Sequence, residues 1–129
     1  MLLVTPIYAA IFGLFLIVLS LRVIRLRQNL AIPIGDGGNP ELARGIGVHA
    51  NFAEYVPLAL ILLYFLEGST GAREWIHTLC LALLAGRVLH AYGVSQLDEK
   101  LAFRVAGMML TFGVIATACL VLIVLYIFG

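Results

Sequence analysis

Charged residues are scarce in this chain. Asp, Glu, Lys and Arg make up 12% of its 129 residues, whereas hydrophobic residues make up 63%. Ordinary soluble domains are only about 45–50% apolar, so this composition argues against a soluble globular domain. The formal net charge of +1 gives no reason to expect a nucleic-acid partner. We therefore expect an integral membrane protein.

Cysteine is almost absent. The two cysteines, Cys80 and Cys119, lie in apolar segments, and the sequence has no CxxC pair. A disulfide framework, a metal site and a cysteine nucleophile are therefore not expected. We expect both thiols to be buried among apolar side chains.

Four apolar runs, at about 2–26, 40–66, 73–95 and 101–128, fill most of the chain. Each has the roughly 20 residues that a helix needs to cross about 30 Å of hydrocarbon. No basic residue precedes the first run, which is also too long for a signal-peptide core, so we expect a retained span. With short connections, the chain is predicted to be one all-α domain over 1–129, an up-down-up-down four-helix membrane bundle.

The second run has a clear helix start. Asn39 is placed to cap the first N–H groups, Pro40 suits the first helical position, and Glu41 is favourable at the positive end of the helix dipole. At its other end, Glu67–Gly71 is predicted to form a short turn before the third helix.

Basic residues gather on one side of the predicted bundle. The side that carries loops one and three has six of them: Arg22, Arg25, Arg27, Arg44, Lys100 and Arg104. The opposite side has only Arg73. The positive-inside rule therefore predicts that loops one and three are cytoplasmic and that both termini lie outside. The cluster of Arg22, Arg25 and Arg27 is expected to grip lipid headgroups.

Two polar residues lie inside the second span. Asn51 and Glu54 share one arc of the helix, about 80° wide, with Arg44 and Gly47. Glu54 follows Arg44 by ten residues, which is about 15 Å along a helix axis and too deep to reach the headgroups easily. An ionisable residue at such depth costs at least about 2.5 kcal/mol, so it should face protein or water.

The other spans add basic groups to the same half of the membrane. Arg87 and His90 share a face of the third helix, and Arg104 opens the fourth. One alternative is a buried ion pair between Glu54 and Arg87 or Arg104 that only locks the bundle. Five such residues on three helices exceed what one ion pair needs. They favour a polar, net-positive pocket with apolar walls, open to the cytoplasm.

Several segments together resemble a known family. They are Arg25-Leu26-Arg27, the run HANFAEYVP at 49–57, Gly86-Arg87-Val88-Leu89-His90, and Arg104. Their order and spacing over nearly the whole chain resemble the membrane-associated proteins in eicosanoid and glutathione metabolism (MAPEG), which include microsomal glutathione transferases. The glycine-rich loop at 35–38 is most similar to that of small bacterial members, which implies a bacterial inner membrane.

This resemblance implies a homotrimer that binds glutathione as co-substrate between subunits. It implies that Asn51 and Glu54 bind the polar backbone of glutathione, that Arg104 is the catalytic residue beside its sulfur, and that a lipophilic electrophile or lipid hydroperoxide enters from the bilayer. The other residues assigned to the glutathione site are Arg25, Arg44, Arg87, His90 and Tyr92. The implied activity is that of a transferase or peroxidase.

Three positions depart from the eicosanoid-making members. Gly47 replaces an arginine, while Val94 and Met108 replace tyrosines. Eicosanoid synthesis is therefore not expected.

Two other functions stay open at this point. A small proton-coupled multidrug exporter would use Glu54 as its proton site. A non-catalytic assembly protein would use the polar stripe only to specify packing between subunits.

Overall fold

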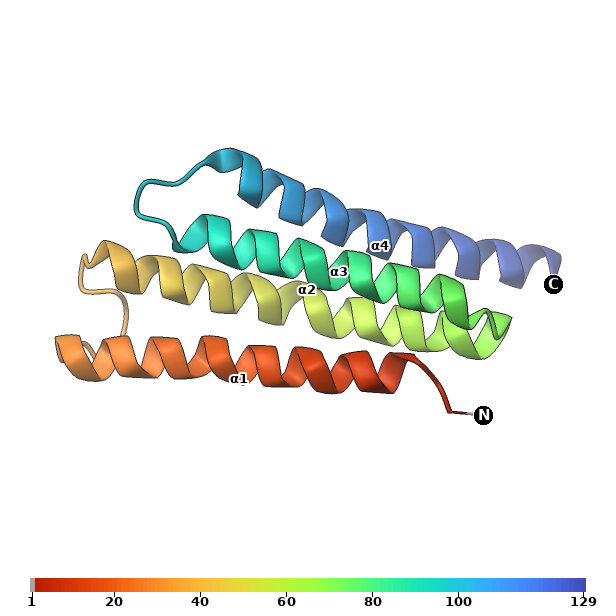
Figure 1. Cartoon of the computed structure of the whole chain (residues 1–129), viewed down its shortest axis with the longest axis horizontal. Coiled ribbons are helices and arrows are strands. Elements are labelled where there is room, and N and C mark those ends of the chain that lie inside the picture. Colours follow the sequence, from red (N-terminus) through yellow and green to blue (C-terminus); the bar gives the residue numbers. More distant parts are fainter. Residues whose placement is uncertain (1) are drawn as a thin grey trace.

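The chain folds into four long helices, described over residues 2–129 in a computed structural model (Figure 1). They are α1 (Thr5–Leu30), α2 (Pro40–Thr70), α3 (Arg73–Ser95) and α4 (Leu101–Phe128). Each is long and apolar enough to cross a membrane. The predicted all-helical architecture with four apolar, membrane-length helices is thus confirmed.

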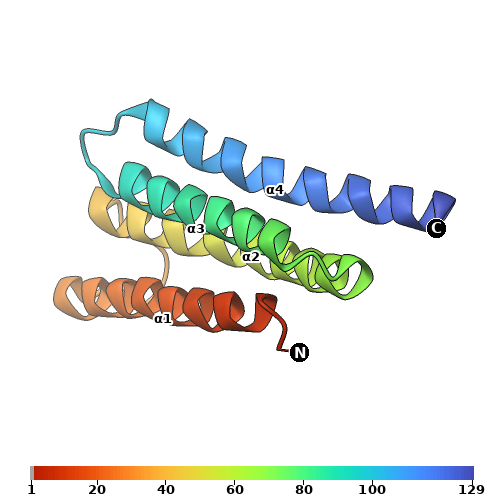
Figure 2. The ribbon, with the colours of Figure 1, turned by 45° about the vertical axis from the view of Figure 1, so that its right-hand side comes forward.

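The helices alternate in direction and form an open bundle. Both termini and the α2–α3 connection lie at one end, and the α1–α2 and α3–α4 loops lie at the other (Figures 1 and 2). Helices α2 and α3 form the centre, with α1 packed mainly on α2 and α4 packed on α3 and α2. No Cα atoms of α1 and α4 lie within 8 Å of each other. We call the end with the two loops the loop end.

All four helices contribute to the core, and α4 adds Val114 and Ala118. The fully covered side chains of the core include Phe12, Leu63, Ile76 and Leu83, each at most 1% exposed. Large apolar side chains also cover the outside, as a helix in contact with lipid requires. Core and surface side chains are therefore both largely apolar, and they differ in how closely they are packed.

The start of α2 is as predicted. The backbone N–H of Leu42 donates to Asn39 Oδ1 at 2.9 Å, and Pro40 occupies the first turn. The predicted turn at Glu67–Gly71 is wrong, because the helix continues to Thr70. Gly71 ends it in the left-handed conformation (φ 65°) and donates to the Glu67 carbonyl at 2.8 Å.

Glu67 also explains why α1 begins at Thr5 and not at the second residue. Its carboxylate is 2% exposed and accepts hydrogen bonds from the backbone N–H groups of Val4 (2.5 Å) and Thr5 (2.8 Å). Helix α1 has no acidic residue in its own first turn. The carboxylate from α2 therefore supplies the cap and joins the two helices at the end opposite the loop end.

Glycines let α3 and α4 approach closely. A Cβ atom built on Gly107 would lie 2.5 Å from the carbonyl oxygen of Gly86, and one built on Gly93 would lie 2.8 Å from Phe103 Cβ. Small residues at such crossings allow backbones to come together in a membrane, where no hydrophobic force drives helices to associate. This contact sets the position of α4 beside the polar residues of α3.

We expect Gly107→Ala to destabilise the protein by about 1–3 kcal/mol, because the new methyl group meets backbone atoms that cannot move aside. Gly113→Ala is the matched control, since a Cβ there has nothing within 4 Å. The control should unfold like the wild type or at slightly higher temperature, because alanine favours helix. Thermal unfolding in detergent measures both, and equal unfolding of the two variants would contradict the proposed backbone contact.

Candidate functional site

The centre of the candidate site is Arg87 of α3. Its side chain is 1% exposed, and its Nη2 donates to Oδ1 of Asn51 on α2 at 2.6 Å. The guanidinium carbon lies 5.8 Å from the centre of the Phe52 ring. Two residues that the sequence placed in one polar pocket are therefore in direct contact, and they join α2 to α3.

The remaining neighbours of this guanidinium are weak acceptors. Nη2 lies 3.4 Å from His90 Nδ1, while Nη1 lies 3.5 Å from Thr111 Oγ1 and 3.7 Å from Met108 Sδ. The Nε atom is buried with no hydrogen-bond partner, and no carboxylate within residues 2–129 forms an ion pair with Arg87. A buried cation without a counter-charge is costly, so this position favours a bound anion.

A cavity of about 240 Å³ lies beside this cluster, toward the loop end. Helices α2, α3 and α4 all contribute to its wall. The lining residues are Gly47, Asn51, His90, Val94, Arg104 and Met108. The cavity thus combines an amide, an imidazole and a guanidinium with apolar surface, which suits a polar anion that meets an apolar reactant.

Arg104 and Arg44 meet at a residue that sequence reasoning missed. Glu99, in the α3–α4 loop, accepts from Arg104 Nε at 2.9 Å and Nη2 at 2.6 Å, and from Arg44 Nη1 at 3.0 Å. Arg44 Nη1 also donates to the carbonyl of Val94 at 2.9 Å. One feature of the sequence could have identified Glu99: it is an acidic residue in a short loop at the end where six basic residues gather.

These ion pairs change the acidity of Glu99. Burial raises its pKa, but hydrogen bonds from Arg44 and Arg104 and the charges of both arginines outweigh that effect. The pKa of Glu99 therefore lies below its usual range. The carboxylate stays ionised at neutral pH and ties the loop to α2 and α4.

Five of the predicted site residues do not line the cavity within one chain. Arg87 and Arg44 make the contacts described above, and the other three face outward. Glu54 and Arg25 are exposed and make no side-chain hydrogen bond or ion pair with any described residue, and Tyr92 is 55% exposed with its ring against Phe103. Glu54 makes no ion pair with Arg87 or Arg104, so the alternative of a locking ion pair within the chain is wrong. These side chains point outward from α1, α2 and α3.

Two arginines of the basic cluster on α1 are used internally. Arg22 Nη1 donates to Ser95 Oγ at 2.5 Å, which links α1 to the end of α3. Arg27 Nη1 donates to the carbonyls of Ile32 and Gly35 at 3.2 and 2.7 Å and so holds the α1–α2 loop. Only Arg25 of the three keeps its charge free of partners among residues 2–129, so lipid anchoring is at most part of the cluster's role.

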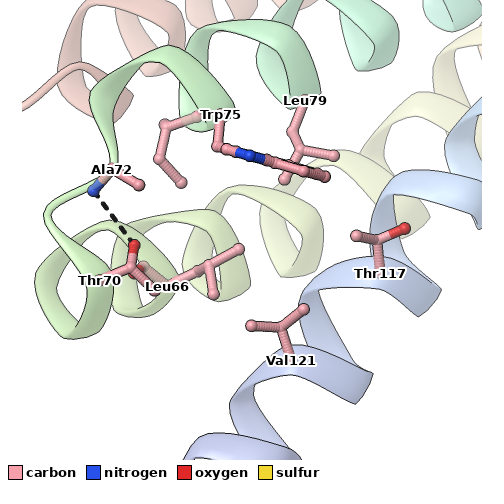
Figure 3. A pocket seen from close by; sticks show the side chains of 8 residues that line it. Leu66, Thr70, Ala72, Trp75, Leu79, Thr117 and Val121 are labelled. Atoms are coloured by element: carbon pink, nitrogen blue, oxygen red, sulfur yellow. Dashed lines mark hydrogen bonds between the residues drawn. The ribbon is translucent and has the colours of Figure 1, made fainter.

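A second hollow, of about 280 Å³, lies near the opposite end of the bundle. Trp75 and Leu79 of α3 face Thr117 and Val121 of α4 across it (Figure 3). None of its lining residues is titratable. It therefore offers apolar space but no group for acid–base or nucleophilic chemistry.

Neither cysteine takes part in the site. Both are free thiols; Cys80 is fully buried as expected, whereas Cys119 is only half-buried because it lies toward the outer side of α4. Within residues 2–129, no group of three or more His, Cys, Asp or Glu side chains could hold a metal ion.

Comparison with known proteins gives a family and two curated relatives. The sequence profile of the MAPEG family matches residues 5–125. Two proteins described as "Inner membrane protein YecN", from Escherichia coli strains K12 and O6:H1, are each 42% identical to the chain over 91 residues. The match covers 70% of this chain and 69% of each relative. No solved structure matches the chain.

The lowered pKa of Glu99 predicts an acid-dependent loss of stability. Its contribution is fully present above the usual glutamate pKa of about 4.3 and is lost as the pH falls through the lower pKa of the folded state. Thermal unfolding followed by the fluorescence of Trp75, the single tryptophan, should therefore show a smaller acid shift for Glu99→Gln than for the wild type.

Asp98→Asn is the control, because it removes the same charge from the same loop and Asp98 has no ion pair among the described residues. This variant should follow the wild type. Identical acid shifts in all three proteins would show that the Glu99 ion pairs contribute nothing to stability.

Proposed function

The chain belongs to the MAPEG family, and on that premise we propose that it is a glutathione-dependent membrane transferase or peroxidase. Its substrates would be lipophilic electrophiles or lipid hydroperoxides. Glutathione would bind in the cavity at the loop end and meet the second substrate, which arrives through the bilayer.

The observation that carries this proposal is the buried guanidinium of Arg87, which lacks a carboxylate partner within residues 2–129. Glutathione has two carboxylates, and a carboxylate matches the donor geometry of a guanidinium. Arg87 does not itself line the cavity, so a ligand there would supply the missing negative charge from beside it. Asn51, which already accepts a hydrogen bond from Arg87, would hold the Arg87 guanidinium in place.

Arg104 is the residue suited to act on the sulfur. Its side chain is 43% exposed and lines the cavity, so a ligand atom has access to it. A free thiol has a pKa near 8.5, and a guanidinium that always stays charged favours the thiolate. The bound thiolate is then the nucleophile, and the protein needs none of its own.

In a conjugation reaction, the thiolate sulfur would donate an electron pair to the electrophilic carbon and form the carbon–sulfur bond. The leaving group, such as a chloride on an activated aromatic ring, would depart with the electron pair of the broken bond. No proton or further electron carrier is required after thiolate formation. The role of the protein is to stabilise the anion and to bring the two reactants together.

Assembly into a homotrimer would explain the outward residues. Glu54 and Arg25 carry opposite charges on exposed surfaces of α2 and α1, at positions within apolar helices. Unpaired charges at such positions are expensive in lipid. A neighbouring subunit would cover them, and Glu54 would then face the amino group of a glutathione bound between subunits.

The three departures from the eicosanoid-making members all lie at the cavity. Gly47, Val94 and Met108 are half of its lining residues. Without the arginine and the two tyrosines, this wall is less polar than that of the eicosanoid enzymes. The proposal is therefore limited to general lipophilic electrophiles and hydroperoxides.

The cellular location follows from the relatives and the charges. The name of the curated relatives places those proteins in the inner membrane, and we assign this chain to a bacterial inner membrane as well. The loop end carries six basic residues against one at the other end. We therefore propose that the loop end, with the cavity, faces the cytoplasm.

The two alternative functions make different demands on Glu54. A proton-coupled exporter needs this carboxylate in its transport cavity, whereas Glu54 does not line the cavity. An assembly protein needs Glu54 and Asn51 only for packing between subunits. Its oligomer would then depend on these residues without any response to glutathione.

We expect glutathione to stabilise the purified protein in detergent. Ligand at one hundred times its dissociation constant stabilises a folded protein by about 2.7 kcal/mol, which a thermal shift detects. Arg104→Ala should still bind but lose the ultraviolet absorbance of the bound thiolate. Arg73→Ala, at the other end of the bundle, should keep both signals. A well-folded wild type that shows no shift with glutathione would refute the proposed function.

A further inference from the structure

Glu99 engages Arg104, which lines the cavity, and Arg44, which lies less than one turn before the lining residue Gly47 on α2. It meets Arg104 side-on through two hydrogen bonds, from Nε to Oε2 and from Nη2 to Oε1. A third hydrogen bond, from Arg44 Nη1, ends on the same Oε1. The Glu99 side chain is only 11% exposed, so this is a closely held pair and not a loose surface contact.

The donors that Glu99 occupies are those that an anionic ligand would need. A carboxylate that binds a guanidinium side-on accepts one hydrogen bond on each of its two oxygens. A carboxylate of the ligand would bind Arg104 in the same way. A thiolate beside Arg104 would also lose part of the attraction of the guanidinium, because the carboxylate neutralises its charge. Glu99 and the ligand therefore compete for the same positive charge.

We propose that Glu99 is a built-in counter-anion of the cavity, which occupies Arg104 and Arg44 in the empty site and which an anionic ligand displaces. The identity of that ligand as glutathione rests on the function proposed above. The occupation of the two arginines does not. Glu99 thus sets how strongly the cavity attracts anions and favours ligands that offer more than one negative group.

Displacement would also free the Glu99 side chain from Arg104, while the backbone still joins the α3–α4 loop to α4. Among residues 2–129, the side chain of Arg104 is hydrogen-bonded to the loop through Glu99, whereas Arg44 keeps a second hydrogen bond to the Val94 carbonyl. The link between α2 and the end of α3 is therefore retained when the carboxylate leaves. The guanidinium of Arg104 would then be free for the ligand, while Arg44 stays bonded to Val94 at the end of α3.

The first test needs no ligand. Phenylglyoxal reacts with accessible, unpaired arginines, and peptide mass spectrometry gives the rate at Arg104. Glu99→Gln should react several-fold faster at Arg104 than the wild type does. Asp98→Asn removes the same charge from the same loop and should react at the wild-type rate. An unchanged rate in Glu99→Gln, and in Glu99→Ala as the second variant, overturns the inference.

The second test measures the affinity for glutathione by thermal shift in the same proteins. Glu99→Gln should bind several-fold more tightly than the wild type and Asp98→Asn. Damage to the fold would weaken binding, so a gain in affinity cannot come from a merely structural role. Equal or weaker binding by Glu99→Gln overturns the inference.

The two tests separate this inference from the proposed function. If no folded variant responds to glutathione while Arg104 still reacts faster in Glu99→Gln, the function fails and the internal counter-anion stands. If the wild type binds glutathione but Glu99→Gln matches it in both tests, the function stands and the inference fails.

Discussion

A guanidinium inside a bundle of apolar helices must find acceptors within the protein, because lipid offers none. Arg87 meets this constraint through Asn51 on α2 and through His90 on its own helix. Its two other acceptors, Thr111 and Met108, lie on α4. Three helices are thus positioned around one cation, and the same three helices line the cavity beside it. No carboxylate among residues 2–129 cancels the charge, and under the proposed function an anion in the neighbouring cavity would do so.

The glycine contact between α3 and α4 makes this arrangement possible. Gly86 precedes Arg87 directly, and Gly107 lies against it from α4. With larger residues at these positions, α4 would stand farther away and Thr111 could not reach the guanidinium. The same approach brings Arg104, less than one turn before Gly107, to the wall of the cavity. Close packing and chemistry are therefore coupled at the α3–α4 crossing.

The bundle itself could be predicted from the sequence. Apolar runs of membrane length indicate the four helices, and Asn39 with Pro40 marks the start of α2 correctly. The turn at Glu67–Gly71 was predicted wrongly because Gly68 and two hydroxyl residues suggest a loop. In the structure, the hydroxyls of Ser69 and Thr70 donate hydrogen bonds to carbonyls of the preceding helical turn. Glu67 in turn caps α1. No local sequence pattern indicates this contact, because its two partners are far apart in the chain.

The candidate site was predictable only in part. Helical spacing places Arg87 beside His90, and the position of Asn51 and Arg104 in the same half of the membrane assigns them to the same pocket. The family resemblance adds their roles. The partner of Arg104 could not be found in this way, because Glu99 acts from a loop whose path no periodicity determines. The outward direction of Glu54 and Arg25 depends on how α1 and α2 rotate against their neighbours. That rotation is set by packing and not by the residues themselves.

The central claim is that a buried, unpaired cation beside this cavity favours the binding of glutathione in it. Equilibrium dialysis of radiolabelled glutathione against the purified protein in detergent tests it most directly, with Arg87→Met compared to the wild type. The account predicts saturable binding by the wild type and loss of that binding in a folded Arg87→Met variant, since methionine keeps the apolar volume but removes the charge. Equal binding by both proteins, or none by the wild type, would contradict it.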